Sequence, residues 1–220
     1  MVKILFGIAE PTYRELTKED NLIEYLTAFA YFLAFAFSIL VLKNIKKNKV
    51  VFSIFIALSV MFLVVGLEEI SYGQRIIGLD NSDIQSENKQ SEINIHNLEL
   101  IQPYRHFYYI TVSFLGAFSW WIIPKITKNE LFIKCLPPKF LFSYFISVLV
   151  MYIAVKSAPL EHRALIVIDD FLIPVTYRFI IRYDSEFFEM ILAFGLLFFA
   201  INAWLTCSSK CSKDCKQSKE

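Results

Sequence analysis

Long apolar runs alternate with short polar segments along most of this chain. A transmembrane helix needs about 20 predominantly apolar residues to cross ~30 Å of hydrocarbon at 1.5 Å per residue. Five runs come close to that length, and most of them contain no charged residue. The pattern predicts transmembrane helices near 25–42, 50–67, 107–123, 140–155 and 187–205.

A sixth apolar segment, 164–181, differs from these runs because charged residues interrupt it. Asp169 and Asp170 lie in its middle, and Pro174 and Arg178 follow. Burying two adjacent carboxylates in lipid costs about 2.5 kcal/mol or more for each of them. We therefore interpret 164–181 as a re-entrant or interfacial segment, with a sixth span as the alternative.

Composition agrees with a membrane protein. The chain has 220 residues, of which 56% are hydrophobic, and a mean hydropathy of +0.49. That is more apolar surface than a soluble domain of this size buries. The predicted fold class is an all-α integral membrane bundle of about five transmembrane helices. It has one transmembrane domain, 1–206, and a basic, cysteine-containing tail, 207–220.

Basic residues cluster on one side of the predicted helices. The loops 43–49 and 124–139 and the tail 206–220 contain 12 Lys and only three acidic residues. The positive-inside rule then predicts an N-terminus outside and a C-terminus in the cytoplasm. All four cysteines fall on the cytoplasmic side, where thiols stay reduced, and we expect no disulfide among Cys135, Cys207, Cys211 and Cys215.

One polar segment, Gly66–Leu98, contains the clearest motif. Glu68 and Glu69 lie where the second apolar run ends, and charge at such a place is costly unless it is paired, hydrated or used. If the helix continues, Glu68 shares a face with Ser71, Tyr72 and Arg75. The segment then closes on Asn94-Ile95-His96-Asn97.

This motif resembles a family of uncharacterised bacterial multi-pass membrane proteins. Members of that family read Glu-Glu-Ile-Ser-Trp-Gly-Gln-Arg and, further on, Gln-Gly-Glu-x-Asn-x-His-Asn. This chain has Tyr72 in place of the Trp, and Ser91 in place of the Gly between Gln90 and Glu92. The resemblance implies localisation in a bacterial inner membrane, and it implies no activity.

The residue types of the motif favour a polar site that faces outward. We predict Glu68, Glu69 and His96 as acid–base groups, and a divalent metal such as Zn held by Glu69, His96 and His162. The alternative is a polar network that only caps helices and locks the loop. The side chains predicted to orient water or substrate are Ser71, Tyr72, Gln74, Arg75, Asn94 and Asn97.

Three further residues have plain explanations. Glu186 and Glu189 precede or open the last apolar run, where carboxylates stabilise a helix N-terminus. The alternative is that they extend the acidic cluster of Glu68 and Glu69 inward. His106, among Tyr104, Arg105 and Tyr108, is typical of the membrane interface.

These observations favour a hydrolase or transferase that acts on a lipid-linked or membrane-proximal substrate. Alternatives are a small cation or proton transporter and a non-catalytic membrane partner subunit. Expected partners are membrane lipids and another membrane protein or a second copy of the chain. No basic nucleic-acid-binding face is present, so nucleic acid is excluded as a partner.

Overall fold

The computed structural model describes residues 22–45, 48–70, 105–157 and 174–217, and these ranges are almost entirely helical. No strand occurs within them, which confirms the predicted all-α class. The elements are α3 (Leu22–Asn44), α4 (Lys49–Glu69), α7 (Arg105–Ile126), α8 (Glu130–Lys134), the 3₁₀ helix η4 (Lys139–Leu141), α9 (Phe142–Ser157) and α10 (Pro174–Gln217).

Four of the described helices are long and apolar enough to cross a membrane. They cover Leu22–Asn44, Lys49–Glu69, His106–Ile126 and Glu186–Ser208. The remaining predicted span, 140–155, corresponds to α9, which has only 16 residues. Because η4 leads directly into α9, the two together rise by about 30 Å, the thickness of the hydrocarbon layer.

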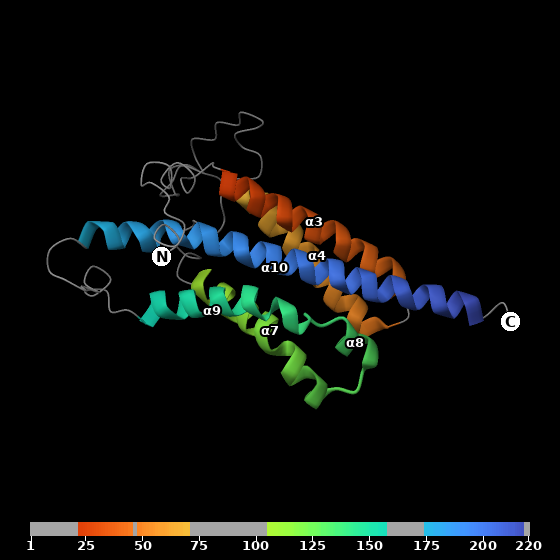
Figure 1. The fold of residues 1–220 in the computed structure, drawn as a ribbon. Coiled ribbons are helices and arrows are strands. Elements are labelled where there is room, and N and C mark those ends of the chain that lie inside the picture. Colours follow the sequence, from red (N-terminus) through yellow and green to blue (C-terminus); the bar gives the residue numbers. More distant parts are fainter. Residues whose placement is uncertain (1–21, 46–47, 71–104, 158–173, 218–220) are drawn as a thin grey trace.

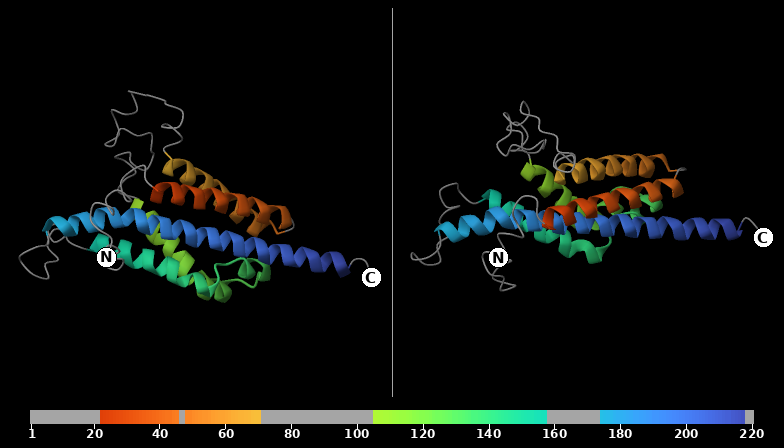
Figure 2. Two further views of the ribbon diagram at one scale, coloured as in Figure 1. Left: turned by 45° about the horizontal axis from the view of Figure 1, so that its top comes forward. Right: turned by 90° about the horizontal axis from the view of Figure 1, so that it is seen from above.

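Helix α10 lies at the centre of the bundle (Figure 1). The hairpin of α3 and α4 packs on one side of it, and the pair α7 and α9 packs on the other, as the two turned views also show (Figure 2). Half of the apolar window of α10 is buried, against 28% for α4 and for α7. Most residues in the apolar windows of α4 and α7 are therefore not fully buried within the bundle.

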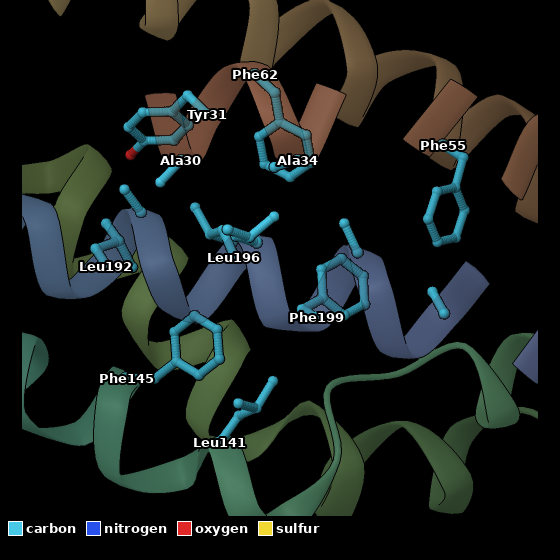
Figure 3. Packing of buried hydrophobic residues seen from close by; sticks show 14 of the residues in the cluster. Ala30, Tyr31, Ala34, Phe55, Phe62, Leu141, Phe145, Leu192, Leu196 and Phe199 are labelled. Carbon is cyan, nitrogen blue, oxygen red and sulfur yellow. The ribbon is translucent and has the colours of Figure 1, made fainter. Parts of the chain in front are cut away.

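Small residues let α3 and α10 approach closely. Ala30 and Ala34 on α3, and Ala193, Ala200 and Ala203 on α10, are all fully buried. Such residues are typical of helix contacts in membranes, where close backbone approach replaces the hydrophobic driving force. Figure 3 shows the larger core side chains above and below α10, among them Tyr31, Phe55, Phe62, Leu141, Phe145, Leu196 and Phe199.

The Phe145 ring of α9 packs against a glycine on each of two neighbouring helices. A Cβ atom added to Gly116 on α7 would lie 2.3 Å from Cδ1 of Phe145. A Cβ atom on Gly195 of α10 would lie 3.4 Å from its Cζ. The buried ring therefore occupies the space that a side chain at Gly116 would need.

Helix α10 extends beyond the predicted span in both directions. Pro174 is its first residue, a position that tolerates the missing N–H group. No proline follows as far as Gln217, so nothing in the sequence stops the helix. Residues 174–181, the described part of the ambiguous segment, therefore belong to α10, and 164–173 lies outside the described residues.

Carboxylates and lysines are concentrated at opposite ends of the bundle, although Glu130 lies among the lysines, and Arg105 and Lys156 lie among the carboxylates. The end where α3 begins and α4 finishes, called here the carboxylate end, carries Glu24, Glu68, Glu69, Glu186 and Glu189. The other end, the lysine end, exposes Lys43, Lys49, Lys125, Lys128, Lys134 and Lys139. At the lysine end Nζ of Lys125 lies 3.6 Å from the centre of the Trp121 ring, and Nζ of Lys139 lies 4.9 Å from that of Trp120. These tryptophans lie at the charged edge of the bundle, the position that aromatic residues favour at a membrane interface.

Two asparagines tie α4 to α8 at the lysine end. Each caps a helix, because Oδ1 of Asn48 accepts from Val51 N (3.2 Å) and Oδ1 of Asn129 accepts from Phe132 N (3.1 Å). Nδ2 of Asn48 also donates to Oδ1 of Asn129 at 3.1 Å.

We expect Asn48→Ala to lower the free energy of unfolding by about 1 kcal/mol, the usual cost of a lost N-cap. Unfolding in mixed detergent micelles, followed by helical circular dichroism, measures this cost. Ser53→Ala, at an exposed position of the same helix, is the control. The double variant Asn48→Ala/Asn129→Ala should cost less than the sum of its parts, and full additivity would show that the cross-link contributes nothing.

A tyrosine and carboxylate site at one end of the bundle

Glu68 and Glu69 form the last turn of α4, and both side chains are half-buried. Ile70 is the C-cap, and its N–H donates to the carbonyl of Glu68. Helix α4 therefore ends at Glu69. Ser71, Tyr72 and Arg75, which a continued helix would place on one face with Glu68, come after that end. Most of the predicted site lies outside the described residues, namely Ser71, Tyr72, Gln74, Arg75, Asn94, His96, Asn97 and His162.

Glu189 is the buried carboxylate of this end of the bundle. It lies fifteen residues after Pro174, far from the first turn of α10, so the expectation that it stabilises a helix N-terminus is wrong. Only 6% of its surface is exposed, and its Oε1 accepts a 2.8 Å hydrogen bond from the hydroxyl of Tyr152 on α9. A buried carboxylate needs such a donor, because desolvation otherwise makes it very costly.

Three tyrosines from α3 and α7 surround this pair. The Tyr109 ring stacks on the Tyr152 ring, with centroids 4.5 Å apart and an interplanar angle of 11°. Tyr108 and Tyr31 share a hydrogen bond, and Tyr108 also donates to Sδ of Met61 on α4 at 3.9 Å. Glu69 and Glu189 both lie close enough to act electrostatically on the hydroxyls of Tyr31, Tyr108 and Tyr109. The two carboxylates and four tyrosines come from all five long helices. We call them the tyrosine–carboxylate cluster: Tyr31, Glu69, Tyr108, Tyr109, Tyr152 and Glu189.

His106, which the sequence predicts at the membrane interface, lies at the edge of this cluster. Its ring centre lies 5.7 Å from that of Tyr152, and its side chain is only partly buried. Sequence reasoning missed this neighbourhood because Tyr152 and Glu189 are 37 residues apart and share no motif. The available signal was Glu189 itself, since it interrupts an otherwise apolar run.

The cluster combines the groups that proton chemistry requires. Two carboxylates can accept protons, and tyrosine hydroxyls can donate hydrogen bonds and hold a substrate in place. Ionisable residues within membrane spans usually mark functional sites. Within the described residues, no group of three or more His, Cys, Asp and Glu side chains could hold a metal ion.

The fold and the apolar helices define the class of this chain, an all-α integral membrane protein. Comparisons with known protein families, with curated protein sequences and with solved structures each found no match. The resemblance of the Glu68–Arg75 motif to a bacterial family therefore remains a prediction.

Proposed function

We propose that this protein is a membrane-embedded hydrolase or transferase that acts at its carboxylate end on a lipid-linked or other membrane-proximal substrate. The observation that carries the proposal is the buried hydrogen bond between Tyr152 and Glu189, at the end of the bundle where Glu69 also lies and where both carboxylates act electrostatically on Tyr31, Tyr108 and Tyr109. By the positive-inside rule this end faces outward in a bacterial inner membrane, because the lysines lie at the opposite end.

The two carboxylates have different surroundings and therefore suit different roles. Glu69 is half-buried at the end of α4, where a substrate head group at the membrane surface reaches it. Glu189 lies deeper and is held by Tyr152, which suits a group that exchanges a proton with the substrate through its neighbours. Paired carboxylates in unlike environments are typical of general acid and general base assignments.

A divalent metal such as Zn belongs to the same proposal. Glu69 would provide one oxygen ligand, with His96 and His162 as nitrogen ligands, the number that catalytic zinc sites take from protein. Both histidines lie outside the described residues. Elemental analysis of purified wild type beside His96→Ala tests this part, since a stoichiometric metal should be lost in the variant.

A cation or proton transporter is the second candidate. It is favoured by the position of Glu189 within the apolar span Glu186–Ser208 rather than at its surface. Against it, the other buried polar side chains among the described residues are one threonine and four serines. A path across the bilayer usually carries more polar residues near its midplane.

We expect Glu69→Gln and Glu189→Gln each to lower turnover at least about 100-fold, the usual contribution of a general acid or base. The assay uses protein in lipid vesicles and measures phosphate released from a polyprenyl diphosphate and fatty acid released from phosphatidylglycerol. Glu130→Gln is the matched control, because Glu130 is an exposed carboxylate at the lysine end and pairs with the exposed Lys134. If wild type turns over neither lipid, while cation or proton uptake into the vesicles depends on Glu189, the transport function replaces the enzymatic one.

A further inference from the structure

Two cysteines meet at the lysine end, although 72 positions separate them in the sequence. Sγ of Cys135 and Sγ of Cys207 lie 3.4 Å apart, and both side chains are almost fully buried. Cys135 follows α8 as its C-cap, and Cys207 lies on α10. The pair therefore bridges the connection between α7 and α9 and the central helix.

Both cysteines are held on fixed backbone. The N–H of Cys135 donates to the carbonyls of Leu131 and Phe132 at 3.0 and 3.1 Å. Next to Cys207, Oγ of Ser208 accepts from Nδ2 of Asn44 at 3.4 Å, which ties this part of α10 to the end of α3. The close approach of the two sulfur atoms is thus a property of the packed bundle.

We propose that Cys135 and Cys207 form a reversible disulfide when a peroxide reaches them. A disulfide bond is about 2.05 Å long, so the two sulfur atoms must approach by about 1.3 Å. Among the residues whose side chains the structure describes, which do not include Cys211 and Cys215, no group of three His, Cys, Asp and Glu could hold a metal ion. Two sulfur atoms at 3.4 Å fit a dithiol that oxidises after a small shift.

The reaction balances with one peroxide for each pair. One thiolate attacks a peroxide oxygen, and the O–O bond breaks. The leaving hydroxide takes the proton that this thiol had lost and becomes water, and a sulfenic acid remains on the sulfur. The second thiol attacks this sulfur, the S–S bond forms, and a second water leaves. Overall, two thiols are oxidised to one disulfide and hydrogen peroxide is reduced to two waters. A dithiol reductant reverses the step by thiol–disulfide exchange.

The sequence alone predicts reduced thiols on the cytoplasmic side. The proposal keeps that expectation for the resting protein and adds a response to oxidant. The new bond would join α10 covalently to the connection between α7 and α9, at the opposite end of the bundle from the tyrosine–carboxylate cluster. It does not depend on the proposed enzymatic function.

Intact-mass spectrometry of the full-length protein tests the proposal. The background is Cys211→Ser/Cys215→Ser, which leaves only the two cysteines of interest. After hydrogen peroxide, this protein should lose the mass of two hydrogen atoms and should regain it with dithiothreitol. Cys135→Ser in the same background should lose no hydrogen atoms. A mass that stays unchanged in the parent, or gains oxygen without losing hydrogen, overturns the proposal.

Peptide mapping of the oxidised wild type gives a second measurement that needs no variant. Trypsin cleaves after Lys134 and Lys210, so it separates Cys135 and Cys207 from the two cysteines of the tail. We expect a linked pair of peptides that contain Cys135 and Cys207. Links from either residue to Cys211, Cys215 or a second chain, in place of this pair, would also overturn the proposal.

Discussion

Gly116→Val should destabilise the bundle by about 3 kcal/mol, because it forces a side chain into space that Phe145 already fills. Even a lone Cβ atom at Gly116 would lie 2.3 Å from the ring of Phe145. That ring is fully buried between α7 and α10, so it cannot swing aside without displacing a helix. Unfolding in mixed micelles of sodium dodecyl sulfate and dodecyl maltoside, followed by helical circular dichroism, measures the loss.

Gly195→Ala is the matched control for this prediction. An added Cβ atom at Gly195 meets its nearest atom, Cβ of Tyr144, at 3.1 Å, so a small shift accommodates it. We also expect Phe145→Leu to rescue part of the stability of Gly116→Val, since a smaller side chain relieves the clash. Equal losses at the two glycines, or no rescue by Phe145→Leu, would contradict the proposed packing.

Tyr152→Phe should lower the free energy of unfolding by about 2 kcal/mol, the usual cost of removing a hydrogen bond to a charged or strongly polar group. The substitution keeps the ring that stacks on Tyr109 and removes only the hydroxyl that donates to Glu189. Because Glu189 is buried, no bulk water replaces this donor. The same detergent unfolding experiment measures the change.

Tyr144→Phe is the control, since Tyr144 lies two turns earlier on α9 and packs edge-on against Phe198. A double-mutant cycle of Tyr152→Phe with Glu189→Ala then isolates the pair, because alanine offers no acceptor to the Tyr152 hydroxyl. Residues in direct contact should show a coupling of about 1 kcal/mol, whereas independent sites are additive within a few tenths. Strict additivity would mean that the hydrogen bond adds nothing to stability.

Most of the fold follows from hydrophobicity alone. The apolar runs predict α3, α4, α7, α9 and α10 to within a few residues at most ends, because a lipid-facing helix needs an unbroken apolar sequence. The exception is α10, whose ends lie in charged sequence. This helix is long because no second proline interrupts the sequence between Pro174 and Gln217. A hydropathy profile does not detect the absence of a proline.

The site was only partly predictable, for a different physical reason. Glu68 and Glu69 were recognisable because they directly follow an apolar run. The partnership of Tyr152 with Glu189, like that of Cys135 with Cys207, depends on how α9 and its preceding connection pack on α10. Packing of this kind is decided by small residues and large rings on helix surfaces, such as Gly116 and Phe145. It produces no periodic pattern of hydrophobic residues in the sequence.

The length of α10 gives the protein a mechanical property. Its 44 residues rise by about 66 Å, roughly twice the thickness of the hydrocarbon layer. About 18 Å of helix precedes the apolar span and about 13 Å follows it. Because the other helices hold α10 only along its apolar span, a force on one protruding end tilts the helix and moves the other end in the opposite direction. Glu189 lies near the start of that span, where a small tilt of α10 changes its distance from α9 without unfolding any helix.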